Sequence, residues 1–71
     1  MNAQLWRVNY GKVYRTGKYA GTLVSGVALF PLKQQAEEYA LALGDGQERM
    51  STYPRGKYRV APGTVHIRGL L

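Results

Sequence analysis

The sequence predicts a small α+β domain in which a four-stranded antiparallel sheet, ordered ββ-α-ββ along the chain, carries one helix on one face. Two observations predict this class. Residues 5–10, 57–61 and 64–68 alternate apolar and polar side chains, as strands with one buried face do. Residues 32–43 repeat apolar side chains at helical spacing. A chain of 71 residues has room for a single domain, residues 1–71, with a thin core.

The first strand is predicted to open a long hairpin. Trp6, Val8 and Tyr10 share one face of this strand, and we expect that face to lie on the core. The strand either turns at residues 11–12 or continues to residue 14. We favour the longer hairpin, with its turn within residues 15–21, because two glycines there supply permissive backbone.

The next two elements are a strand and the helix. Residues 22–30 are rich in β-branched and small apolar side chains, which predicts a largely buried central strand, bulged at Gly26. Pro31 suits the first position of a helix. Its apolar stripe consists of Leu32, Ala36, Tyr39, Ala40 and Leu43, and Gly44 suits the position after the helix ends.

The last third of the chain predicts a loop and two strands. Residues 45–56 are polar, which predicts a mobile loop of about a dozen residues, a length that is usually functional or mobile. Residues 57–61 and 64–68 then alternate on either side of the turn dipeptide Pro62-Gly63. Tyr58 is expected in the core. The sheet face without a helix is expected to present Arg7, Asn9, Lys57, Arg59, Thr64, His66 and Arg68.

Positive charge is concentrated outside the helix. The chain carries +6 overall and +7 without residues 32–44, because Glu37 and Glu38 lie in the helix. Cations interleaved with tyrosines suit a polyanion with stackable bases. We therefore predict a small basic nucleic-acid-binding protein that uses its open sheet face and hairpin, with DNA or RNA, single or double strand, left open. Predicted phosphate contacts are Arg7, Lys12, Arg15, Lys18, Arg55, Lys57, Arg59 and Arg68; predicted stacking residues are Tyr14 and Tyr19.

Two other functions fit the same pattern. The chain is similar in size to the accessory modulators of phages and plasmids, so one alternative is a protein-interaction module that blocks a partner surface. A second alternative is an assembly component, an oligomer whose sheet edges pair with neighbours. Lysine and arginine on an open sheet face also serve to prevent unwanted edge pairing, without any ligand.

Catalytic and metal-binding patterns are missing from the sequence. His66 is the only histidine and there is no cysteine, so we expect no metal, no cofactor and no enzyme activity. Glu37 and Glu38 are adjacent on the helix, so their side chains diverge by roughly 100° and do not form an acid–base pair. Met1 to Leu5 lacks the pattern of a secretory signal, and the longest apolar run, residues 22–32, is too short for a membrane helix. We expect a cytoplasmic protein with no membrane contact.

Two segments resemble known families. Residues 30–39, Phe-Pro-Leu-Lys-Gln-Gln-Ala-Glu-Glu-Tyr, resemble the strand-to-helix junction of the integrase arm-type and AP2-like DNA-binding domains, in which the sheet enters the major groove. This resemblance covers residues 5–43 and implies DNA binding through the sheet, although 28 further residues depart from the pattern. Residues 5–8 and 56–60 are similar to the two sheet starts of the peptidoglycan-binding sporulation-related repeat, whose second helix is missing here.

Overall fold

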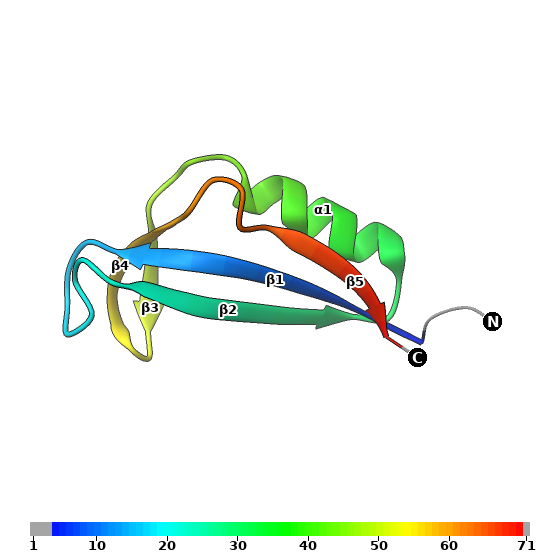
Figure 1. The fold of residues 1–71 in the computed structure, drawn as a ribbon, viewed down its shortest axis with the longest axis horizontal. Helices are drawn as coiled ribbons and strands as arrows, with labels where there is room; N and C mark the ends of the chain where they lie inside the picture. The colour runs from blue at the N-terminus through cyan, green and yellow to red at the C-terminus, as the bar shows by residue number, and fades with distance from the viewer. Residues whose placement is uncertain (1–3, 71) are drawn as a thin grey trace.

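The computed structural model describes residues 4–70 and confirms the α+β class (Figure 1). One curled antiparallel sheet has the strand order β2-β1-β4-β3, and β5 also pairs with β1. The layout is the predicted one with a further strand. The elements are β1 (Leu5–Tyr14), β2 (Leu23–Phe30), α1 (Lys33–Leu43), β3 (Arg49–Thr52), β4 (Arg55–Val60) and β5 (His66–Leu70).

The long first strand organises the sheet. Along one edge, β1 pairs with the whole of β2, from Trp6 opposite Phe30 to Val13 opposite Leu23. Along its other edge, β1 pairs first with β5 and then, from Lys12 onward, with β4. One strand therefore connects two halves of the sheet. The molecule is elongated as a result, with extents of 43 × 20 × 18 Å.

The core lies between α1 and one face of the sheet. Val8 and Ala36 are fully buried there, and Trp6, Tyr39 and Tyr58 pack around them as predicted. The hydroxyls of Tyr10 and Tyr39 lie 3.2 Å apart, and their rings meet edge to face with centroids 6.1 Å apart. Burial, followed by this hydrogen bond, raises the pKa of Tyr10, because a phenolate is poorly solvated there.

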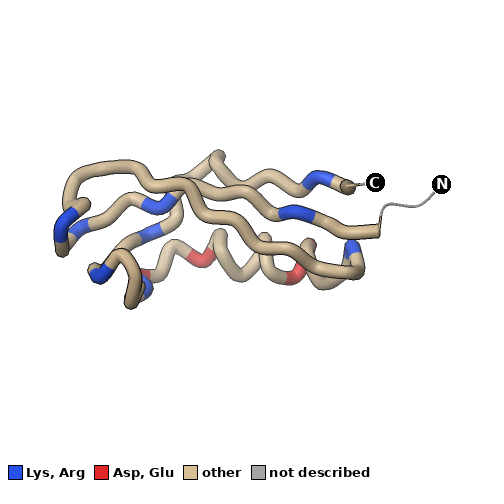
Figure 2. The backbone as a smooth tube through the Cα atoms, turned by 90° about the horizontal axis from the view of Figure 1, so that it is seen from below, with Lys and Arg blue, Asp and Glu red and all other residues tan. Residues whose placement is uncertain are grey.

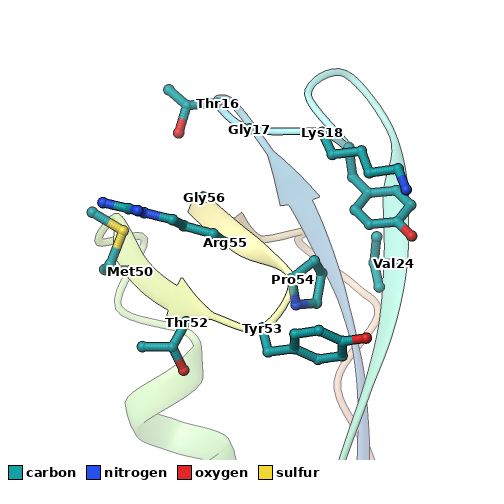
Figure 3. Close-up of a pocket in the computed structure, with 11 residues that line it drawn as sticks. Thr16, Gly17, Lys18, Val24, Met50, Thr52, Tyr53, Pro54, Arg55 and Gly56 are labelled. Atoms are coloured by element: carbon teal, nitrogen blue, oxygen red, sulfur yellow. The ribbon is translucent and has the colours of Figure 1, made fainter.

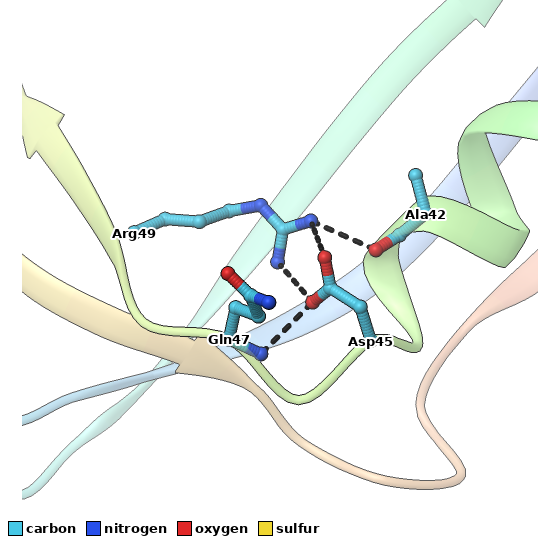
Figure 4. A network of polar contacts seen from close by, with 4 residues as sticks. All are labelled: Ala42, Asp45, Gln47 and Arg49. Carbon is cyan, nitrogen blue, oxygen red and sulfur yellow. Dashed lines mark hydrogen bonds and ion pairs between the residues drawn. The ribbon is translucent and has the colours of Figure 1, made fainter.

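The segment predicted as a loop, residues 45–56, is largely a hairpin. Residues 49–52 form β3, which pairs with β4 and turns at the cis Tyr53-Pro54 peptide. The guanidinium of Arg49 ties this hairpin to the end of α1, donating to the Ala42 carbonyl at 2.8 Å and to the Asp45 carboxylate (Figure 4). The sequence did not predict β3 because this strand lacks the usual alternation of apolar and polar side chains. An arginine and a serine occupy the positions that face the core side, and the strand is defined by its pairing with β4.

The second strand lies at an edge and not at the centre of the sheet. Leu23, Val27 and Leu29 are 63%, 58% and 53% exposed, because α1 covers only the other face. The predicted bulge at Gly26 is also wrong, since pairing with β1 runs through it without interruption. This glycine instead makes room for the ring of Tyr10, which lies opposite it.

The helix begins two residues later than predicted. Leu32 is the N-cap residue with extended backbone, φ −121° and ψ 140°, and its side chain is exposed and not part of the core stripe. Gly44 ends the helix with φ −81°, so its role does not depend on a left-handed conformation. The other four residues of the predicted stripe lie in or against the core.

Candidate nucleic-acid interface

The sheet face opposite α1, here called the open face, has two chemically different sides. Paired residues share a face, so the pairing of Val13 with Arg59 and of Arg7 with Arg68 places all four on the open face. On β2 this face is apolar and exposed. On β4 and β5 it presents Arg55, Lys57, Arg59, His66 and Arg68, all exposed.

The cations of β4 form a continuous row. Arg55, Lys57 and Arg59 occupy alternate positions, so their side chains leave the same face about 6.6 Å apart along the strand. Among residues 4–70 the two ion pairs are Arg15 with Glu48 and Arg49 with Asp45, and neither uses this row. We call these three residues the β4 row.

One carboxylate lies beside the row and is already neutralised. Glu48 accepts two hydrogen bonds from the guanidinium of Arg15, at 2.5 and 2.9 Å. The hydrogen bond from Arg15 lowers the pKa of Glu48, and the charges of Lys57 and Arg59 add to the effect. The positive field of the row is therefore not cancelled by an acid of its own.

Most of the net charge lies at the end of the molecule that contains this row. This cationic end consists of residues 11–22 and 45–60, which hold seven of the ten basic residues and two of the four acids. It therefore carries +5 of the total of +6. In Figure 2 most of the blue segments lie toward the end of the molecule away from the two termini, while others lie near the termini.

A hollow of about 800 Å³ opens at the cationic end between two chain reversals (Figure 3). One reversal is the β1–β2 connection, residues 15–22, and the other is the β3–β4 turn at Tyr53-Pro54. Its lining includes two cations, Lys18 and Arg55, and two tyrosines, Tyr19 and Tyr53. The Tyr53 side chain is 94% exposed, so its ring is available to a ligand.

Hydrogen bonds hold the two sides of the hollow together. The Arg15 N–H donates to the Lys57 carbonyl at 2.7 Å, and the Lys57 N–H donates to the Thr16 hydroxyl at 2.9 Å. Gly17 has φ +90°, and a Cβ there would lie 2.1 Å from the carbonyl oxygen of Arg55. Only glycine allows so close an approach in this conformation, so the connection is docked on β4.

Three predicted residues occupy environments that differ from the expected one. Tyr14 is 1% exposed and packs against Tyr58 with ring centroids 5.4 Å apart, so its predicted stacking on bases is wrong. Lys12 points to the face that bears α1, with its ammonium 5.3 Å from the Tyr58 ring centroid. The guanidinium of Arg15 is paired with the carboxylate of Glu48.

Arg7 and Arg68 lie apart from the cationic end. They face each other directly across β1 and β5 on the open face, an arrangement of like charges that is unfavourable without a counter-ion. Arg7 is half-buried, and its Nε has no hydrogen-bond partner among the described residues. Neither arginine forms an ion pair with a residue among 4–70.

Tyr53 was missed by the sequence analysis, which placed it in a loop. The sequence signal that could have identified it is a tyrosine directly before a proline, in a polar turn segment close to Arg55. Within residues 4–70 no helix has the length and apolar character needed to cross a membrane, and no three acidic or histidine side chains gather to hold a metal ion.

Comparison with known proteins finds no match of this chain to a family model, a curated protein or a solved structure. The two family resemblances described above therefore remain predictions. The geometry of the cationic end is the basis on which a function can be proposed.

Proposed function

We propose that this protein binds nucleic acid, with phosphates along the β4 row and bases in the adjoining hollow. The observation that carries this proposal is the row itself: three exposed cations on one face of one strand, with no carboxylate partner among residues 4–70. Phosphate contacts of this kind provide most of the affinity in non-specific nucleic-acid binding. The charge of +5 on the cationic end also favours rapid encounter with a polyanion.

The hollow supports nucleic acid in preference to other polyanions. Arg55 belongs to the β4 row and also lines the hollow, so it connects the cations to the tyrosines. Tyr53 presents nearly its whole ring to solvent, and Tyr19 is exposed on the opposite side. Aromatic rings beside a cationic track are the usual means of holding unpaired bases, at about 1–3 kcal/mol per stacked base.

The test compares a lysine in the β4 row with a lysine outside it. Lys57→Glu removes a cation from the row, and Lys33→Glu does so at the start of α1; both lower the net charge from +6 to +4. Fluorescence anisotropy would measure binding to labelled single- and double-stranded DNA and RNA across a salt series. We expect Lys57→Glu to weaken binding to every sequence and to reduce the slope of log K against log salt by about 1. Lys33→Glu should have an affinity and a salt slope close to those of the unmodified protein.

Two results would contradict the proposal. If both variants lose affinity equally, the protein responds to net charge and the β4 row is not the site. If no saturable binding persists at about 150 mM salt, the function itself is wrong. The nucleic acid that binds most tightly identifies the substrate form. A thermal melt of each variant verifies folding, because the Lys33 ammonium lies 5.4 Å from the Trp6 ring centroid.

A further inference from the structure

β2 is an edge strand without the usual protection against pairing. Its sequence, Leu-Val-Ser-Gly-Val-Ala-Leu-Phe, contains no charge and no proline, and its pairing with β1 has no bulge. Natural edge strands are normally blocked by one of these devices. Each of the other four strands carries at least one lysine or arginine. β2 is therefore the strand of this sheet best suited to accept another strand.

The odd-numbered residues of β2 offer both free backbone hydrogen-bonding groups and apolar surface. Tyr14 donates its N–H to the Thr22 carbonyl at 3.2 Å, so even-numbered residues turn their backbone groups toward β1. By alternation, the N–H and C=O groups of the odd-numbered residues of β2 face outward. These residues are Leu23, Ser25, Val27 and Leu29, and the side chains of the two leucines and the valine form an exposed apolar strip on the open face.

We propose that β2 pairs with β2 of a second copy of this chain, antiparallel, about a two-fold axis at Gly26. Paired residues must share a face, so a two-fold axis perpendicular to the sheet keeps both open faces on one side. In this register Leu23 lies opposite Leu29 of the second copy, and Ser25 lies opposite Val27. The outward backbone groups of both strands then meet, and the apolar strips join into one patch.

Charge selects this edge for self-association. Two chains of +6 repel each other, but β2 brings uncharged strands together. The two copies of β1 would be separated by three strand spacings, about 14 Å, which exceeds the Debye length of about 8 Å at physiological salt. The opposite edge, β3, is four residues long and contains Arg49, with the β4 row in the next strand. Self-pairing there would bring like charges close together.

The dimer would contain one continuous sheet with the apolar patch at its centre and a β4 row toward each side of the same face. This inference does not rest on the proposed nucleic-acid binding, because it concerns the free protein. Its test contains no nucleic acid, so failure of one proposal leaves the other intact.

The first experiment is sedimentation velocity from about 5 to 500 µM protein. Val27→Lys places a cation in the apolar strip, and Leu41→Lys makes the same type of change on α1, where Leu41 is 79% exposed. We expect the unmodified chain to dimerise reversibly, Val27→Lys to weaken the dimer at least tenfold and Leu41→Lys to leave it unchanged. A monomer at all concentrations, or equal loss in both variants, would overturn the proposal.

The second experiment tests the register and does not depend on Val27→Lys folding. The chain has no cysteine, so the double variant Leu23→Cys/Leu29→Cys introduces the only thiols. Across the proposed pair the Cα atoms are about 5.5 Å apart, within disulfide range, whereas within one chain they are separated by about 20 Å. Oxidation should therefore give a covalent dimer with the double variant and not with either single variant. Equal cross-linking in the single variants, or none in the double variant, would overturn the register.

Discussion

The contact between Tyr10 and Gly26 gives a prediction whose magnitude follows from the structure. The Tyr10 ring lies over Gly26, and a Cβ added there would be 2.4 Å from Cε2 and 2.5 Å from Cζ of the ring. The ring is held in place by its hydroxyl contact with Tyr39, at 3.2 Å, and by the core behind it. Gly26→Ala therefore forces the Tyr10 ring to move, and this movement breaks the contact between the Tyr10 and Tyr39 hydroxyls.

The expected destabilisation is the balance of three terms. Overpacking of this kind costs about 1–3 kcal/mol, and the lost hydrogen bond costs about 1 kcal/mol. Replacing a strand glycine by alanine returns about 0.5–1 kcal/mol through the unfolded chain. The net loss is about 1–3 kcal/mol in the free energy of unfolding. For a domain of this size, each kcal/mol lowers Tm by about 4–8 °C.

Urea denaturation with two comparison variants would measure this loss. Gly44→Ala is the matched control, because its Cβ would meet nothing closer than the Leu41 carbonyl at 3.5 Å and its φ is −81°. It should change stability by less than about 0.5 kcal/mol. In a Tyr10→Val background, Gly26→Ala should no longer destabilise, since the ring is gone. A neutral Gly26→Ala, or the same loss in both backgrounds, would refute the reasoning.

Two further predictions concern the cationic end. Because Arg15 lowers the pKa of Glu48, the Arg15–Glu48 pair stabilises the fold above the unfolded pKa of the carboxyl, and this contribution is lost as pH falls through the folded pKa. Arg15→Gln should raise the pKa of Glu48 toward its ordinary value in an NMR titration, and an unchanged pKa would show that the pair does not form in solution. Tyr53→Ala should leave the free energy of unfolding within about 0.5 kcal/mol while weakening single-strand binding by about 1–3 kcal/mol. Tyr53→Phe should retain binding, and equal affinity of all three proteins would exclude stacking at this position.

The two proposals use different parts of one sheet face. The β4 row and the hollow lie at the cationic end, and of β2 only Val24 lines the hollow; the odd-numbered residues of β2 form the outer edge on the far side of β1. In a β2-paired dimer, one nucleic-acid strand bound at each row would give two-site binding, and linking the sites would raise the apparent affinity without any new contact. Comparing the salt dependence of binding with that of dimerisation would distinguish the contributions, since an apolar strand interface responds weakly to salt.

The local pattern of the sequence determined the helix, most strand positions and the direction of most side chains. Alternation in residues 5–10 and 57–60 correctly assigned Arg7, Lys57 and Arg59 to one face and Val8 and Tyr58 to the other. This succeeded because alternation in a strand and apolar periodicity in a helix are properties of neighbouring residues. The excess of basic residues outside the helix was equally visible without a structure.

Strand order and exposure were decided only by the tertiary structure. The apolar run of residues 22–30 is compatible with either a central or an edge strand, and long-range pairing with β1 alone placed it at the edge. Tyr14 and Tyr53 are both tyrosines among polar neighbours, yet β4 pairs against Tyr14 and buries it, while the β3–β4 turn leaves Tyr53 in solvent. Burial depends on which distant segment packs against a residue, and a local pattern carries no information about that partner.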